Sequence, residues 1–99
     1  MWRSAGRVAD FLKDAGKTVE MEGLKVALFN VNGKFYAMAD ACPHRGGPLG
    51  EGFLGGSRVT CPWHAWEFDV KTGECSTMKG AKQKTYAIKI ENEEVWVDF

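Results

Sequence analysis

The sequence predicts an all-β fold, arranged as an antiparallel sandwich or barrel. Near the C-terminus apolar residues alternate with polar or small ones, at Tyr86, Ile88, Ile90, Val95 and Val97. This period of two is typical of half-buried strands. Asn32-Gly33 separates two apolar runs, and this pair is a strong signal for a tight hairpin because both residues tolerate positive φ. Many short strands at close spacing, without a repeat, are typical of this architecture.

The N-terminal half is expected to pass from a brief helical start to strands. Within the first sixteen residues we expect a strand stub and one or two helical turns, since Val8, Phe11 and Leu12 fall at i, i+3 and i+4. Gly16 is a plausible stop for these turns. Strands are then expected at 18–21, 25–31 and 34–39, with turns at 22–23 and 32–33. The strand at 25–31 is nearly all apolar, which predicts burial on both faces.

The second half begins with an irregular stretch, residues 40–57, which holds six of the twelve glycines and two of the three prolines. It also contains Cys42 and His44, so it is not a linker. A glycine-rich loop that keeps potential ligands indicates backbone packed closely around something. Further strands are expected at 58–60, 66–70, 86–90 and 95–98, with turns at 71–73 and 91–93.

Length and charge bound the possible functions. Ninety-nine residues make one domain, and 13 Lys and Arg balance 13 Asp and Glu. This balance argues against binding of nucleic acid or of an anionic membrane surface. The longest apolar run, Val26–Phe29, is far shorter than the roughly 20 residues of a membrane-spanning helix. The N-terminus is charged rather than apolar, so we expect no signal peptide, no membrane contact and a cytoplasmic location.

Two short segments combine sulfur and nitrogen donors. Cys42-Pro43-His44 and Cys61-Pro62-Trp63-His64 contain both histidines and two of the three cysteines, with sixteen residues between His44 and Cys61. In a reducing compartment cysteines are first interpreted as ligands or reactive thiols. Thiolates suit iron–sulfur clusters and zinc, and imidazole suits both metals. Because each segment offers one donor of each type, the pattern favours a two-iron centre, whereas structural zinc fingers usually pair like with like.

The pattern resembles the Rieske [2Fe–2S] family. The resemblance rests on residues 42–49 and 61–64, on Phe68-Asp69 and on Thr72-Gly73, and the flanking strands extend it over almost the whole chain. It implies a Rieske (ISP-like) antiparallel β-sandwich or barrel, a single domain over 1–99, with a two-loop cluster-binding subdomain at about 40–67. It also implies one Rieske-type [2Fe–2S] cluster. Cys42 and Cys61 would hold one iron, and His44 and His64 the other.

The mixed ligand set implies a formally neutral oxidised cluster, and such centres span about −150 to +300 mV against about −400 mV for all-cysteine ones. High-potential members carry a disulfide whose two positions are occupied here by Gly47 and Trp63. They also have Gly-Ser after the second histidine, where this chain has Ala65-Trp66. Because the serine hydroxyl donates to a sulfide, its loss lowers the potential, so we expect a value near about −150 mV. For Ala65, in place of the glycine that many relatives have, we expect a small shift in potential.

The resemblance implies a soluble, monomeric one-electron carrier and not an enzyme, so no catalytic residue is predicted. A flavin-dependent NAD(P)H reductase would supply electrons and a terminal oxygenase would accept them, with transient docking around His44 and His64. No histidine remains for the mononuclear iron of an oxygenase. Alternatives are the small subunit of an assimilatory nitrite reductase and a zinc-stabilised interaction module. We interpret Cys75 as a structural thiol, Trp66 as core packing, and Lys79, Lys82 and Lys84 as a solvated face.

Overall fold

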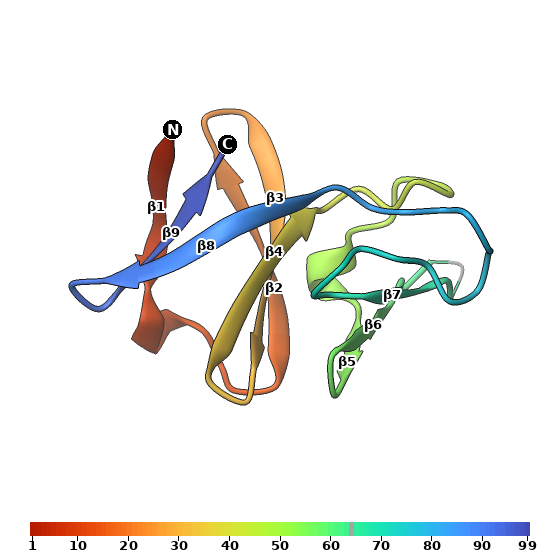
Figure 1. The fold of residues 1–99 in the computed structure, drawn as a ribbon, viewed down its shortest axis with the longest axis horizontal. Helices are drawn as coiled ribbons and strands as arrows, with labels where there is room; N and C mark the ends of the chain where they lie inside the picture. Colours follow the sequence, from red (N-terminus) through yellow and green to blue (C-terminus); the bar gives the residue numbers. More distant parts are fainter. Residues whose placement is uncertain (64) are drawn as a thin grey trace.

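The computed structural model, which describes residues 1–63 and 65–99, is built from two antiparallel sheets (Figure 1). The larger sheet contains β1 (Trp2–Arg7), β2 (Ala15–Met21), β3 (Leu24–Val31), β4 (Lys34–Ala39), β8 (Thr85–Glu91) and β9 (Glu94–Asp98), in the order β1-β9-β8-β4-β3-β2. The smaller sheet contains β5 (Phe53–Gly55), β6 (Arg58–Thr60) and β7 (Glu67–Asp69) in sequence order. Short 3-10 turns are η1 (Val8–Asp10) and η2 (Leu49–Glu51). The predicted all-β class is confirmed.

Three two-residue turns set the register of the larger sheet. Asn32 and Gly33 have φ of 51° and 92°, and they join β3 to β4 as the sequence predicts. Glu22-Gly23 joins β2 to β3, and Asn92-Glu93 joins β8 to β9, again with positive φ at both residues. Positive φ at both central positions matches the right-handed twist of the paired strands. These turns therefore fold the chain into successive antiparallel hairpins.

The strand β3 supplies side chains to two separate cores. Val26 and Leu28 lie in a core that also contains Val95 and Val97 of β9. Ala27 and Phe29, on the other face, lie in a second core with residues of the loops and of the smaller sheet, among them Leu49, Val59 and Phe68. The prediction that this strand is buried on both faces is confirmed. β3 thus links the sheet to the part of the chain that holds the two Cys-His segments.

The larger sheet curls so that its two edge strands approach each other. Arg3 of β1 forms an ion pair with Glu22, which directly follows β2. The Arg3 guanidinium also donates to the backbone oxygen of Phe99 at 3.0 Å and lies 4.6 Å from the centroid of its ring. The ion pair between Arg3 and Glu22 therefore bridges the two edges of the curled sheet.

The N-terminal segment differs from the prediction. Its helical part is only η1, three residues of 3-10 turn, and Leu12 is 78% exposed rather than part of an apolar stripe. Gly16 is not a stop, because β2 already includes it. A Cβ at Gly16 would lie 2.7 Å from the Phe29 ring, so glycine here permits close strand packing. Among the described residues, no helix is long and apolar enough to cross a membrane.

Candidate metal centre

The two Cys-His segments lie in neighbouring loops at the right-hand end of the molecule (Figure 1). The first loop, residues 40–48, connects β4 to η2, and the second loop, residues 61–66, connects β6 to β7. In the first loop the N–H of Gly46 donates to the oxygen of Cys42 at 2.7 Å, and the N–H of Cys42 donates to the oxygen of Gly47 at 2.8 Å. The first loop therefore folds back over Cys42.

The second loop closes in a similar way. The N–H of Cys61 donates to the oxygen of Trp66 at 2.8 Å, and the N–H of Ala65 donates to the oxygen of Cys61 at 3.1 Å. Ala65 has a φ of 59°, the left-handed region that favours glycine. A glycine, which the family resemblance leads us to expect at this position, would adopt this conformation without strain. His64, a predicted ligand, lies outside the described residues.

The fold brings the thiols of Cys42 and Cys61 together. Both side chains are only 2% exposed and lie in the same core, close enough for Cys61 to act on the pKa of the Cys42 thiol. Burial raises the pKa of the Cys42 thiol above its usual value of 9.0. The backbone N–H groups of His44 and Arg45 act in the opposite direction on this pKa, since they donate to the sulfur, and the neighbouring Cys61 thiol raises it further. One sulfur donor from each loop is thus held in a buried site lined with N–H donors.

Gly47 permits the close contact between the loops. A Cβ at this position would lie 2.7 Å from Cys61 Sγ and 3.2 Å from the Cβ of Trp63. A disulfide places its two Cβ atoms about 3.5–4.5 Å apart. Positions 47 and 63 are therefore neighbours at nearly the separation that a disulfide requires. With glycine and tryptophan there, the loops are held by packing instead.

His44 lies at the exposed tip of the first loop, and its ring stacks on Trp66 of the second loop. The ring centroids are 4.2 Å apart and the planes are inclined by 1°. Trp66 also packs against the core that contains Phe68, as expected, but its contact with His44 was not predicted. Within residues 1–63 and 65–99, no three His, Cys, Asp or Glu side chains gather closely enough to hold a metal ion. The structure therefore pairs the two sulfurs and places His44 beside Trp66.

Two buried polar side chains that the sequence reasoning missed fix the flanks of the first loop. Asp40 Oδ1 accepts hydrogen bonds from the Thr18 hydroxyl at 2.8 Å and from the N–H of Gly50 at 2.9 Å. The Gln83 side-chain amide donates to the backbone oxygens of Ala39 at 2.8 Å and of Ala41 at 2.6 Å. Both residues are almost fully buried. Their hydrogen bonds tie the start of the loop to β2, η2 and residue 83.

Cys75 is a buried free thiol with a local partner. It belongs to the same core as the loop cysteines, and its sulfur accepts a hydrogen bond from the N–H of Met78 at 3.3 Å. These contacts support the structural role inferred from the sequence.

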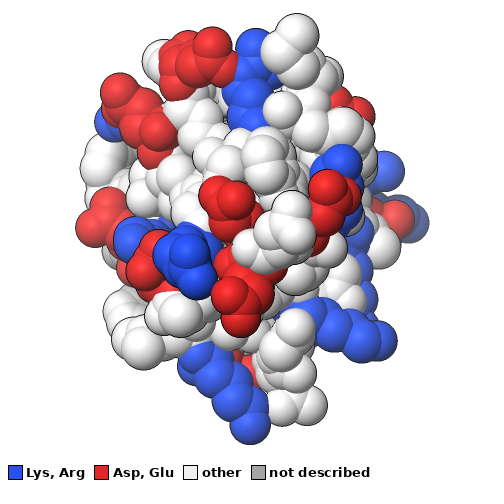
Figure 2. All heavy atoms as spheres, turned by 90° about the vertical axis from the view of Figure 1, so that its left-hand side faces the viewer, with Lys and Arg blue, Asp and Glu red and all other residues white. Residues whose placement is uncertain are grey.

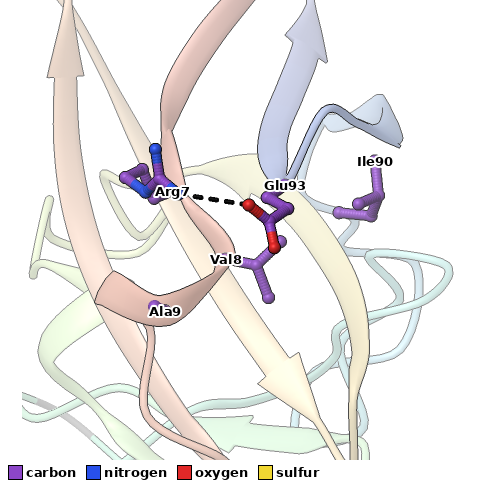
Figure 3. A pocket seen from close by; sticks show the side chains of 5 residues that line it. All are labelled: Arg7, Val8, Ala9, Ile90 and Glu93. Atoms are coloured by element: carbon purple, nitrogen blue, oxygen red, sulfur yellow. Dashed lines mark hydrogen bonds and ion pairs between the residues drawn. The ribbon is translucent and has the colours of Figure 1, made fainter.

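The structure also contains a hollow at the end of the molecule away from the loops (Figures 1 and 3). Its volume is about 410 Å³, and it is lined by Arg7, Val8, Ala9, Ile90 and Glu93. The Arg7 guanidinium and the Glu93 carboxylate face each other at 3.3 Å, as the dashed line in Figure 3 marks. This lining consists of a closed ion pair and apolar groups. The sulfur and imidazole donors are at the other end, which makes the loops the candidate site.

The residues of the loops fit an iron–sulfur cluster. Two buried sulfurs from separate loops, with backbone N–H groups directed at one of them, provide the soft donors and hydrogen bonds that such clusters require. The exposed imidazole of His44 follows one of these sulfurs at a spacing of two residues.

Comparison with known proteins gives a consistent result. The model of the Rieske [2Fe-2S] domain matches residues 1–90. The naphthalene 1,2-dioxygenase system ferredoxin component of Pseudomonas putida is 36% identical over 98 residues, covering 98% of this chain and 94% of that protein. The Sphingomonas yanoikuyae B1 ferredoxin superposes with a TM-score of 0.91 at 27% identity, covering 100% and 99% of the two chains.

Two further structures are similar. A chain in the complex of reduced oxygenase and oxidized ferredoxin in carbazole 1,9a-dioxygenase has a TM-score of 0.88 and 27% identity, covering 97% of this chain and 91% of that one. A protein described as the small subunit of an NADPH nitrite reductase has a TM-score of 0.87 and 25% identity, covering 100% and 99%.

Proposed function

The chain belongs to the Rieske [2Fe-2S] domain family, and we propose that it works as a soluble one-electron carrier of a ring-hydroxylating dioxygenase system. The observation that carries this proposal is the meeting of the Cys42 and Cys61 thiols between two loops at one end of the molecule. The naphthalene 1,2-dioxygenase ferredoxin component and the Sphingomonas yanoikuyae ferredoxin, each matched over nearly the whole chain, are electron-carrier components rather than catalysts. The chain therefore makes and breaks no substrate bonds itself.

We propose that Cys42 and Cys61 hold one iron and that His44 and His64 hold the other. The bound cluster would supply a centre that accepts and releases one electron. The chain contributes a buried environment for both sulfurs and N–H donors from His44 and Arg45 to the Cys42 sulfur. Such hydrogen bonds and burial are among the factors that set a cluster's reduction potential. The serine donor of high-potential members is absent, so a potential near about −150 mV remains our proposal.

The exposed tip of the loops is the proposed electron-transfer face. His44, Arg45, Gly46 and Ala65 are exposed, and Trp63 is 59% exposed beside them. We propose that a flavin-dependent NAD(P)H reductase and a terminal oxygenase dock here in turn, with small interfaces below about 1,200 Å². The ferredoxin in the carbazole 1,9a-dioxygenase complex supports an oxygenase as one partner. We further propose that the chain acts as a cytoplasmic monomer.

The proposal is tested on protein purified without oxygen. Iron and acid-labile sulfide are measured, and electron paramagnetic resonance is recorded at low temperature after dithionite reduction. We expect about two irons and two sulfides per chain and a Rieske-type signal. Replacement His44→Ala should abolish the signal, whereas Cys75→Ser, which changes a cysteine bonded only locally, should leave it unchanged. A full Rieske signal in His44→Ala would refute the ligand assignment.

A second candidate is a fixed subunit of a nitrite reductase, favoured by the likeness to the nitrite reductase small subunit over both chains. Copurification with a sirohaem-containing protein would support this alternative. Reduction by a flavoprotein reductase without a stable complex would contradict it. A colourless protein containing zinc and no iron would instead indicate a zinc-stabilised module.

A further inference from the structure

A short segment after the smaller sheet carries an unbalanced positive charge. Residues 76–84, here called the basic strap, include Lys79, Lys82 and Lys84 and contain no acidic residue. All three lysines are exposed. The remaining C-terminal residues, 85–99, have the opposite balance, with one lysine against four acidic residues. The chain as a whole has no formal net charge, so the strap is a local feature.

The basic strap is hydrogen-bonded to residues that flank both loops. On the side of the first loop, Gln83 donates to Ala39 and Ala41, and the N–H of Ala39 donates to the oxygen of Lys84 at 2.9 Å. On the side of the second loop, the N–H of Ser76 donates to the oxygen of Glu67 at 2.9 Å. The N–H of Glu67 in turn donates to the Thr77 hydroxyl at 2.9 Å. The strap therefore runs beside the two loops, at the right-hand end of Figure 1.

Within the described residues the cations of the strap form no ion pair, which is also true of several lysines elsewhere in the chain. In the part of the chain that the structure describes, no carboxylate oxygen lies within 4.0 Å of the amino groups of the strap lysines or of the Arg45 guanidinium. Glu74 faces Lys82 across an isolated β-bridge, without forming an ion pair. At the opposite end Arg3, Arg7 and Lys89 each pair with a glutamate. Figure 2, which faces that end, shows acidic and basic side chains interleaved.

We propose that the basic strap, together with Arg45, is a docking surface for a redox partner that presents an acidic protein surface. The inference rests on the proposed function, because it takes the loops as the end through which electrons pass. A protein without net charge has little long-range steering of its own, so an uneven local potential decides how a partner is oriented on encounter. Positive charge beside the loops would orient carboxylates of the partner toward the exposed tip.

The experiment measures how fast the reduced holo-protein is oxidised by small reagents of opposite charge. Stopped-flow rate constants are compared for anionic Fe(EDTA)⁻ and for cationic tris(phenanthroline)cobalt(III), over a range of ionic strength. We expect the rate with the anion to fall as salt is added and the rate with the cation to rise. In a variant combining Lys79→Gln, Lys82→Gln and Lys84→Gln, the rate with the anion at low salt should drop about tenfold.

The matched control is Lys89→Gln, which removes one cation that already pairs with Glu91 at the far end. It should leave both rates and the reduction potential unchanged. Poly-L-glutamate, a probe for an acidic protein surface, should slow the anion reaction of the wild-type protein but not of the triple variant. If poly-L-glutamate failed to slow the anion reaction of the wild-type protein, or if the triple variant kept the wild-type anion rate, the docking inference alone would be overturned. If neither reagent oxidised the protein, the electron-carrier function itself would fail.

Discussion

Gly52 packs tightly against the backbone beside both loops, and its replacement by alanine should weaken both the fold and the cluster site. A Cβ there would lie 2.3 Å from the oxygen of Thr60 and 3.1 Å from that of Leu49. Thr60 directly precedes Cys61, and Leu49 directly follows the first loop. Because ordinary contacts of a Cβ begin at 3.4 Å, the backbone must move by about 1 Å. The φ of Gly52 is −77°, so the effect is one of space and not of backbone strain.

Forcing an extra methyl into a well-packed site costs about 1–3 kcal/mol. For a domain of this length, each kcal/mol lowers the melting temperature by about 4–8 °C, which gives a decrease of about 4–24 °C for Gly52→Ala. Gly55→Ala is the matched control, because a Cβ there meets nothing within 4 Å and its φ lies outside the left-handed region. Far-ultraviolet circular dichroism follows unfolding, and visible absorbance follows loss of the cluster. Equal melting temperatures and equal iron content in both variants would refute the reasoning.

Two further predictions concern Ala65 and Cys42. Ala65→Gly should raise the melting temperature. The left-handed φ of 59° at this exposed residue costs about 1–2 kcal/mol with alanine, whereas the greater conformational entropy of unfolded glycine offsets only about 0.5–1 kcal/mol of this gain. A lower melting temperature in the variant would contradict this strain. Burial raises the pKa of the Cys42 thiol above 9.0, so the metal-free folded state keeps that proton longer than the unfolded state. The contribution of this thiol to the free energy of unfolding is fully present below the ordinary thiol pKa, and it is lost as the pH rises through the raised pKa of Cys42. The urea midpoint of metal-free protein should therefore fall as the pH rises past the ordinary thiol value of 9.0, and Cys42→Ser should flatten this dependence. An equal decrease in the variant would rule out Cys42 as its source.

The features that the sequence predicted correctly depend on local chemistry. The turn at Asn32-Gly33 follows from two residues that accept positive φ, and the turn at 22–23 has one such residue, Gly23. The strand at 34–39 was predicted with its observed bounds. Spacing and residue type also singled out Cys42 and Cys61, which the structure places in one core, while their role as ligands stays a prediction. The exposed Leu12 shows the limit of a helical pattern in a segment that forms only one short turn.

The features that could not be predicted depend on contacts between distant parts of the chain. Gln83 bonds to Ala41 across 42 positions, and Thr18 bonds to Asp40 across 22. The stacking of His44 on Trp66 likewise joins two loops whose relative placement is set by the smaller sheet. In each case the residue type alone is compatible with a solvated surface. Only the pairing of strands and the meeting of the loops give these side chains their partners.

An electron carrier must hold its cluster rigidly and also keep it within reach of a partner, and different residues of this site meet these two requirements. The sulfurs of Cys42 and Cys61 are buried and share a core with β3 through Phe29 and Ala27, so packing against a strand buried on both faces helps to fix their positions. Two residues beyond Cys42, the chain is already exposed at His44. Because burial and exposure alternate over so few residues, the donors can be held rigidly while the tip stays within reach of a partner. Changes in the core should therefore alter cluster retention, whereas changes in the basic strap should alter the rate of encounter without altering retention.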